Sequence, residues 1–149
     1  MTVGSTVLVT GGAGYIGSHA VLGLADRGQP VVVLDDLSTG RQQRIPKGVP
    51  FIEGDVSDKR LVTAALSEHQ IGSVMHFAGS IIVSESVRDP AKYYRNNTVA
   101  SLNLIESCCA AGVGEFIFSS TAAVYGSPDS VPVSEDPPTN PMSRTGRPS

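Results

Sequence analysis

The chain has 149 residues, of which 40% are hydrophobic and 17% charged, and its formal net charge is −3. This composition is typical of one globular α/β domain that can bury a core, and it offers no basic cluster for nucleic acid. The sequence contains neither an N-terminal signal-peptide pattern nor an apolar run of membrane-spanning length, and its two cysteines, Cys108 and Cys109, are adjacent. We therefore expect a cytoplasmic protein without a nucleic-acid or membrane partner, a metal or a disulfide.

A glycine-rich turn follows the first predicted strand, residues 7–9. The turn reads Thr10-Gly-Gly-Ala-Gly-Tyr-Ile-Gly17, and a helix continues from it to about residue 28. A strand, a glycine turn and a helix start in this order are typical of dinucleotide-binding proteins. Gly11 permits a tight turn, Gly14 lets the backbone approach a pyrophosphate, and Gly17 lets the helix and strand pack closely. The helix N-terminus offers unpaired N–H groups to phosphates.

A second buried strand, residues 31–34, leads into Asp35 and Asp36. Asp35 follows Gly17 at about the spacing of a carboxylate that binds the adenosine ribose. A carboxylate there accepts hydrogen bonds from the ribose hydroxyls and repels the 2′-phosphate of NADP, so the predicted cofactor is NAD. The alternative interpretation is that Asp35 caps the turn after the strand.

Three more strands and two more helices are predicted downstream. The strands are 51–52, 71–77 and 115–118; Asp58 caps the helix before the second of them, whose apolar positions are 61, 62, 65 and 66. Asp89 and Pro90 open a long helix that Gly112 ends. The apolar stripe of this helix includes Val99, Leu102, Ile105 and Cys109.

The alternation of strands and helices predicts a Rossmann-like, doubly wound parallel sheet in residues 1–126. Residues 127–149 form a proline-rich tail in which no further periodic element is predicted. Ligands of such sheets bind beyond the carboxyl ends of the strands. Small, acidic or hydroxyl residues occupy five such ends, namely Gly11 to Gly17, Asp35, Asp55, Phe77 to Gly79 and Ser119 to Thr121.

Eight stretches resemble the UDP-glucose 4-epimerases of the extended short-chain dehydrogenase/reductase family: residues 10–19, 35–40, 53–56, 76–79, 85–87, 93–97, 118–126 and 131–136. The resemblance covers nearly all of the chain. It implies NAD as cofactor, a UDP-hexose as substrate, and interconversion of UDP-glucose and UDP-galactose. It implies cofactor contacts at Gly11, Gly12, Gly14, Tyr15, Ile16, Gly17, Asp35, Asp36, Leu37, Ser38, Thr39, Gly40, Asp55, Val56, Phe77, Ala78, Gly79, Ser80, Ile81 and Asn96.

The same resemblance implies the catalytic groups. Thr121 matches the Ser or Thr that hydrogen-bonds the sugar hydroxyl, and a Tyr-x-x-x-Lys element supplies the base. Thr145 stands where the Tyr belongs and Ser149 where the Lys belongs. The resemblance thus implies that the tail leads to an incomplete active-site segment and that the fold is truncated before the substrate domain. An aliphatic hydroxyl is too weak an acid to replace a phenol, so neither residue is expected to function. A one-base shift of DNA encoding Tyr-Gly-Pro-Ser-Lys would give the residues found at 145–149.

We therefore expect an inactive N-terminal part of an epimerase, which could pair as a homodimer through helices that include the one after Asp89. Two alternatives stay open: a stand-alone NAD-binding module, and a part of another nucleotide-sugar epimerase or dehydratase. Ala122 and Ala123 stand where dehydratases carry an acid pair, and methyl groups cannot transfer protons, which disfavours dehydration. His76 is expected to be a hydrogen-bonded packing residue rather than a base.

Overall fold

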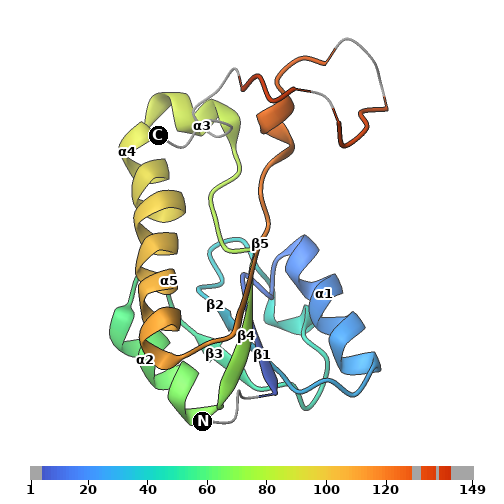
Figure 1. Ribbon diagram of the computed structural model, residues 1–149, viewed down its shortest axis with the longest axis vertical. Helices are drawn as coiled ribbons and strands as arrows, with labels where there is room; N and C mark the ends of the chain where they lie inside the picture. The colour runs from blue at the N-terminus through green and yellow to red at the C-terminus, as the bar shows by residue number, and fades with distance from the viewer. Residues whose placement is uncertain (1–4, 129–131, 137, 142–149) are drawn as a thin grey trace.

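A five-stranded parallel sheet lies at the centre of the protein (Figure 1). The structure is a computed structural model that describes residues 5–128, 132–136 and 138–141. The strand order is β3-β2-β1-β4-β5, so the chain changes direction across the sheet between β1 and β4. The strands are β1 (Thr6–Thr10), β2 (Val31–Asp35), β3 (Phe51–Glu53), β4 (Ile71–His76) and β5 (Glu115–Phe118). The predicted doubly wound parallel sheet is confirmed.

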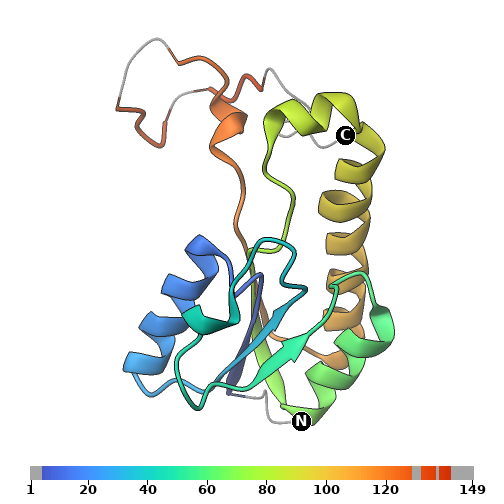
Figure 2. The ribbon, with the colours of Figure 1, turned by 180° about the vertical axis from the view of Figure 1, so that it is seen from behind.

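Helices cover both faces of the sheet. Figures 1 and 2 show α1 (Tyr15–Asp26) on one face, with α2 (Lys59–Glu68) and α5 (Ala100–Ala111) on the other. Successive side chains of a strand point to opposite faces, so β1 and β2 contribute buried side chains to a core on each face of the sheet. The core beneath α2 and α5 contains Leu8, Val32, Leu34 and Val74, and the core beneath α1 contains Val7, Val9, Val21, Val31 and Val33.

The predicted start of α2 is confirmed. The carboxylate of Asp58 accepts hydrogen bonds from the backbone N–H groups of Arg60 and Leu61, at 3.0 and 3.1 Å. Such a cap satisfies two of the donors that a helix N-terminus leaves unpaired. Three of the four predicted apolar positions, Val62, Ala65 and Leu66, are buried, and Leu61 packs against them from the edge of the core.

The long helix after Asp89 begins and ends as predicted but is not regular. Asp89 accepts a hydrogen bond from the N–H of Lys92, and Gly112 ends the helix with a left-handed φ of 74°. Between these ends the chain forms α4 (Pro90–Tyr93), a π-helical segment η2 (Tyr94–Val99) and α5. A further short helix, α3 (Val83–Arg88), precedes them, and 3₁₀ turns occur at Gln42–Arg44 and Ala122–Tyr125; the sequence did not predict these three elements.

The apolar stripe predicted for the long helix does not face the core. Val99, Leu102 and Ile105 are 48%, 54% and 40% exposed, and Cys109 is exposed as well. The buried face instead carries Ala100, Ser101, Leu104, Ser107 and Cys108. Small side chains on this face let the helix lie close to the sheet, and Ser101 must face inward to bond a buried histidine of β4. Within the part of the chain that the structure describes, no helix combines the length and apolar character needed to cross a membrane.

Candidate functional site

The glycine-rich turn packs directly onto the loop that follows β4. Gly11 has a left-handed φ of +69°, and its N–H donates to the carbonyl of Leu34 at 2.8 Å. A Cβ on Gly11 would lie 2.6 Å from the nitrogen of Ala78 and 2.7 Å from the carbonyl carbon of Phe77, too close for any side chain. The tight turn therefore requires glycine at this position, as predicted, and the close approach of the loop after β4 is a second reason for glycine that the sequence did not predict.

The third glycine of the motif packs against the turn rather than against a strand. A Cβ on Gly17 would collide with the carbonyl oxygen of Gly11 and lie 2.9 Å from Cα of Gly12. The predicted close packing is thus present, but it joins α1 to the turn. Gly14 precedes the first residue of α1, and neither a capping side chain nor an acidic residue occupies this helix start. The side chains of Tyr15 and Ile16 are 73% and 61% exposed there.

The carboxylate of Asp35 links the end of β2 to the glycine-rich turn. It is 7% exposed, and its Oδ2 accepts a hydrogen bond from the N–H of Ala13 at 2.9 Å. Its Oδ1 accepts from the N–H of Leu37 at 2.8 Å, so Asp35 also caps its own turn, as the alternative interpretation required. Each carboxylate oxygen can accept a second hydrogen bond, so these contacts leave Asp35 able to receive ribose hydroxyls. The two interpretations of Asp35 are therefore compatible.

The loop after Asp35 is hydrogen-bonded to Ala13, the residue whose N–H donates to Asp35. The N–H of Arg41 donates to the carbonyl of Ala13 at 3.0 Å, and Nη1 of Arg44 reaches the same oxygen at 3.4 Å. A Cβ on Gly40 would lie 2.7 Å from Oδ1 of Asp35, so the loop passes tightly over the carboxylate. These contacts bring the predicted segment Asp36, Leu37, Ser38, Thr39 and Gly40 beside the glycine-rich turn.

Asp55 and Val56 differ in their surroundings although both follow β3. Asp55 is exposed, and its Oδ1 accepts a hydrogen bond from the N–H of Ser57 at 2.7 Å. Val56 is 8% exposed and belongs to the core beneath α2 and α5. The N–H of Gly54 donates to the backbone carbonyl of Asp35 at 3.1 Å, which places this segment beside the end of β2.

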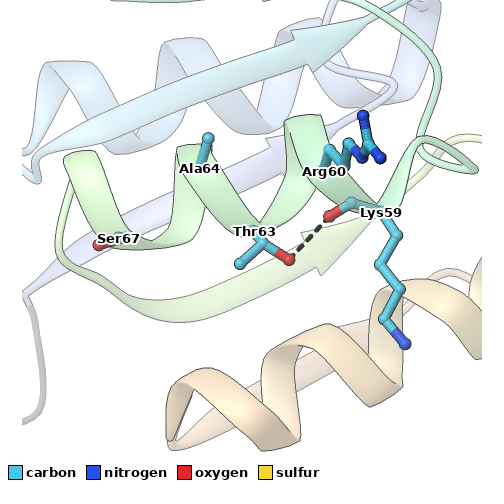
Figure 3. A pocket seen from close by; sticks show the side chains of 5 residues that line it. All are labelled: Lys59, Arg60, Thr63, Ala64 and Ser67. Atoms are coloured by element: carbon cyan, nitrogen blue, oxygen red, sulfur yellow. Dashed lines mark hydrogen bonds between the residues drawn. The ribbon is translucent and has the colours of Figure 1, made fainter.

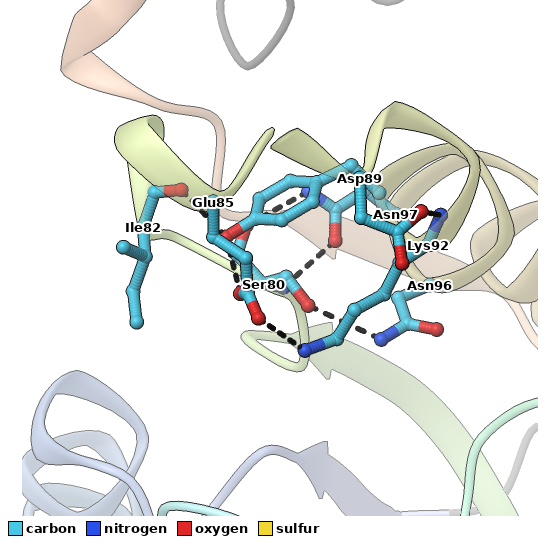
Figure 4. A network of polar contacts seen from close by, with 8 residues as sticks. Ser80, Ile82, Glu85, Asp89, Lys92, Asn96 and Asn97 are labelled. Atoms are coloured by element: carbon cyan, nitrogen blue, oxygen red, sulfur yellow. Dashed lines mark hydrogen bonds and ion pairs between the residues drawn. The ribbon is translucent and has the colours of Figure 1, made fainter. Parts of the chain in front are cut away.

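The loop after β4 is held by two asparagines of the π-helical segment (Figure 4). Asn97 accepts from the backbone N–H of Ser80 at 2.7 Å and donates to the carbonyl of Ser80 at 2.9 Å. Asn96 donates to the hydroxyl of Ser80 at 3.2 Å. Ile81, next in the loop, is 82% exposed. Sequence reasoning singled out Asn96 and missed Asn97; the adjacent pair of amides was the signal that could have found it.

His76 is buried at the end of β4, with an exposed fraction of 1%. Its Nδ1 lies 2.6 Å from the hydroxyl of Thr10, and its Nε2 lies 2.8 Å from the hydroxyl of Ser101. Burial lowers the pKa of the imidazole from 6.5 to about 4, so it is neutral at physiological pH. Both ring nitrogens are bonded within the protein, which confirms a hydrogen-bonded packing residue.

Thr121 caps the 3₁₀ turn Ala122–Tyr125 that follows β5. Its hydroxyl oxygen accepts a hydrogen bond from the N–H of Ala123 at 3.2 Å, and the side chain is half-buried. The N–H of Ser119 donates to the carbonyl of His76 at 3.1 Å, so the two strand ends lie together. Thr145 and Ser149 lie outside the described residues.

A polar cluster links α3 to α4 just after the loop that follows β4 (Figure 4). The carboxylate of Glu85 accepts hydrogen bonds from Nζ of Lys92 at 2.7 Å and from the buried hydroxyl of Tyr93 at 3.0 Å. These two bonds lower the pKa of Glu85, and the carboxylate raises the pKa of Lys92. The Tyr93 hydroxyl also donates to the carbonyl of Ile82 at 2.7 Å, so the cluster fixes the start of α3.

A shallow hollow on α2 lies apart from these residues. It is lined by Lys59, Arg60, Thr63, Ala64 and Ser67, all from one helix (Figure 3). None of the candidate site residues lines it. Among the residues that the structure describes, no group of three or more His, Cys, Asp or Glu side chains could hold a metal ion.

A parallel doubly wound sheet with a glycine-rich turn at its switch point defines the class of dinucleotide-binding Rossmann proteins. The family described as "NAD dependent epimerase/dehydratase family" matches residues 7–148. The chain belongs to that family.

Named relatives and solved structures are similar over most of this chain. A UDP-glucose 4-epimerase of Azospirillum brasilense is 55% identical over 140 residues, which cover 94% of this chain and 40% of the relative. The crystal structure of UDP-glucose 4-epimerase from Brucella ovis in complex with NAD matches with a TM-score of 0.87 and 42% identity, over 95% of this chain and 43% of that one. The complex of Thermus thermophilus UDP-glucose 4-epimerase with NAD matches with a TM-score of 0.87 and 43% identity, over 95% and 46%. The chain thus spans less than half the length of these proteins.

Proposed function

We propose that this chain is the NAD-binding part of a UDP-glucose 4-epimerase. The observation that carries the proposal is the contact between Asp35 and Ala13, which puts a carboxylate beside the glycine-rich turn at the switch point of the sheet. A dinucleotide needs both groups at once: backbone N–H donors for its pyrophosphate and an acceptor for its ribose hydroxyls. The NAD complexes of similar proteins support the same cofactor.

The described residues fit such a ligand. Glycine at positions 11 and 17 keeps the turn compact, because a Cβ at either position would collide with backbone atoms. The first turn of α1 carries no acidic side chain that would repel a phosphate. We assign the cofactor contacts to the turn, to residues 35–40, to Asp55 and Val56, to residues 77–81 and to Asn96. Residues 1–126 would then form the cofactor domain, and residues 127–149 would lead from it.

The carboxylate of Asp35 favours NAD over NADP. A 2′-phosphate on the adenosine ribose would place negative charge against Asp35, which is 7% exposed and therefore poorly screened by water. Arg41 and Arg44 lie in the adjoining loop, but the guanidinium of Arg44 is directed to the carbonyl of Ala13. The proposal therefore predicts selective binding of NAD.

A UDP-hexose is the proposed substrate of the whole protein, by analogy with the named relatives. When bound, NAD supplies reversible hydride acceptance to the reaction. Thr121, at the end of β5, would hold a sugar hydroxyl through its side-chain oxygen. The base is the missing part: Thr145 and Ser149 carry aliphatic hydroxyls at the Tyr and Lys positions, so the 149-residue chain alone is proposed to be inactive.

A homodimer and a cytoplasmic location complete the proposal. Val99, Leu102 and Ile105 form an exposed apolar stripe that runs from the end of η2 onto α5, with spacings that put the three side chains on one side. A second copy of the chain could cover this stripe in a helix-to-helix contact. Cys108 and Cys109 are both free thiols, which suits a reducing compartment.

Calorimetric titration of the purified chain with NAD and with NADP tests the proposal. We expect saturable, one-site binding of NAD and much weaker binding of NADP. A folded chain that binds neither nucleotide would overturn the proposal. NAD binding combined with full epimerase turnover by the chain alone would instead refute the proposed inactivity. If the chain binds NAD and the cells that produce it contain no longer protein with the same sequence, the stand-alone NAD-binding module is favoured.

A further inference from the structure

We propose that Asn97 is a positioning residue for the nicotinamide half of the cofactor site. The proposal rests on the proposed NAD binding and concerns the loop after β4, residues 77–82, which has no regular secondary structure. This loop lies beyond the carboxyl end of β4, at the switch point where the ligand crosses the sheet. Something must fix its backbone, because a loop without ladder hydrogen bonds is otherwise free to shift.

The loop is held at its start, in its middle and at its end, where the Tyr93 hydroxyl donates to the carbonyl of Ile82. At one end, the nitrogen of Ala78 and the carbonyl carbon of Phe77 pack against Gly11 so closely that a Cβ there would not fit. In the middle of the loop, Asn97 bonds both backbone groups of Ser80, accepting from its N–H and donating to its carbonyl. The side-chain amide of Asn97 thereby pairs with the N–H and the carbonyl of one residue, as the backbone of a neighbouring strand would.

The geometry around Asn97 is specific for an amide of this length. A Cβ on Gly79 would lie 3.3 Å from Oδ1 of Asn97, so the backbone of the loop packs closely against the side-chain amide of Asn97. One side chain must both accept and donate, and Asn does so from a single planar group. An Asp at this position would keep an acceptor for the N–H of Ser80 but would set a carboxylate oxygen against its carbonyl.

The π-helical segment explains how two neighbouring amides reach one loop residue. Asn96 and Asn97 lie in η2, between α4 and α5, and both bond Ser80 (Figure 4). A π turn widens the helix locally, and such turns occur often at functional sites. The two amides act differently: Asn96 bonds only the hydroxyl of Ser80, whereas Asn97 holds its backbone.

The two halves of a dinucleotide make this inference testable. Asp35 and the glycine-rich turn lie toward β2, where the adenosine half binds, whereas the loop held by Asn97 follows β4 on the other side of the switch point. A loss of loop position should therefore weaken binding of the whole dinucleotide and leave binding of its adenosine half unchanged. A general loss of fold stability would weaken both alike.

The experiment compares ADP and NAD binding by calorimetry in the wild-type chain, in Asn97→Ala and in Lys92→Met. The Lys92→Met control breaks the ion pair with Glu85 next to the same segment without touching Ser80. We expect Asn97→Ala to weaken NAD binding by roughly tenfold, the effect of losing two hydrogen bonds, with ADP affinity unchanged. The control should change neither affinity. Amide hydrogen exchange at Ser80 should accelerate in Asn97→Ala alone.

Two results for the variant would overturn the inference without contradicting the proposed function. One is an equal loss of ADP and NAD affinity in Asn97→Ala; the other is no loss of either. A wild-type chain that binds ADP and NAD equally weakly would instead reject the proposed function, and this inference with it. Should Asn97→Ala not fold, Asn97→Asp conserves the volume of the side chain and is expected to show the same NAD-specific loss.

Discussion

The hydroxyl of Thr10 lies 2.6 Å from Nδ1 of His76, and this contact joins the two central strands at the last residue of each. Gly11 follows one of these residues and Phe77 the other, so the contact sets the spacing between the glycine-rich turn and the loop after β4. The hydroxyl of Ser101 completes the chain of hydrogen bonds from α5. A single buried imidazole thus holds two strands and a helix together.

Acid should destabilise the protein through His76. The pKa of its imidazole is about 4 in the folded state and 6.5 when unperturbed, so the unfolded state takes up a proton first as pH falls. Stability from this residue is complete above pH 6.5, decreases between 6.5 and 4, and changes no further below 4. We expect a loss of about 2 kcal/mol between pH 7 and pH 5 in urea unfolding experiments.

The control for this prediction is His76→Gln, which cannot take up a proton in that range. The variant should be less stable at pH 7, because a buried hydrogen-bond network is damaged, but its stability should change less between pH 7 and pH 5. Parallel curves for the two proteins would mean that His76 is not the source of the acid sensitivity.

Two glycines of α1 should respond to alanine in opposite ways. In Gly17→Ala the new methyl group collides with the carbonyl of Gly11, and we expect a loss of about 3 kcal/mol together with weaker NAD binding. In Gly23→Ala the nearest atom is Nη1 of Arg27 at 4.0 Å, and we expect a gain of about 0.5 to 1 kcal/mol from helix propensity. Thermal unfolding of the two variants measures both. Equal effects would show that α1 does not pack against the turn.

Asp35→Asn should reduce the preference for NAD. The amide keeps the size of the carboxylate but loses the charge that repels a 2′-phosphate, so we expect NAD to bind about tenfold more weakly while NADP loses less. Asp26→Asn, at the exposed end of α1, is the matched control and should leave both affinities unchanged. An unaltered ratio of NAD to NADP affinity in Asp35→Asn would show that the ratio has another origin.

Restoring the catalytic pair should not restore turnover. The double variant Thr145→Tyr/Ser149→Lys supplies the phenol and the ammonium, but the chain spans only 40% of its relative from Azospirillum brasilense. We expect no conversion of UDP-galactose to UDP-glucose by this variant in a chromatographic assay. Measurable conversion would mean that residues 1–149 hold enough of the substrate site for catalysis.

The exposed stripe of Val99, Leu102 and Ile105 should decide the oligomeric state. We expect the chain to sediment as a dimer and Leu102→Glu to sediment as a monomer, because a charge at that position would be buried in the contact between copies. Thr63→Glu, on the exposed side of α2, is the control and should remain dimeric. A wild-type chain that sediments as a monomer would reject the dimer.

The sequence by itself determined the five strands, the helix ends at Asp58, Asp89 and Gly112, and the class of cofactor. Asp58, Asp89 and Gly112 act through bonds within a few residues, so their patterns are readable without the fold. The glycine-rich turn is equally local, and the spacing from it to Asp35 is set by the length of one helix. The predicted five-stranded parallel sheet followed from the same local patterns.

Only the tertiary structure decided which side of α5 is buried and what holds the loop after β4. The stripe of Val99, Leu102 and Ile105 is apolar, yet the helix turns Ser101 inward because His76, 25 residues earlier, offers a buried nitrogen. Asn97 meets Ser80 from within the π-helical segment that precedes α5, a departure from regular helix that the sequence pattern did not predict. These choices depend on partners distant in sequence, and hydrophobic periodicity carries no information about a hydrogen bond to a residue elsewhere in the chain.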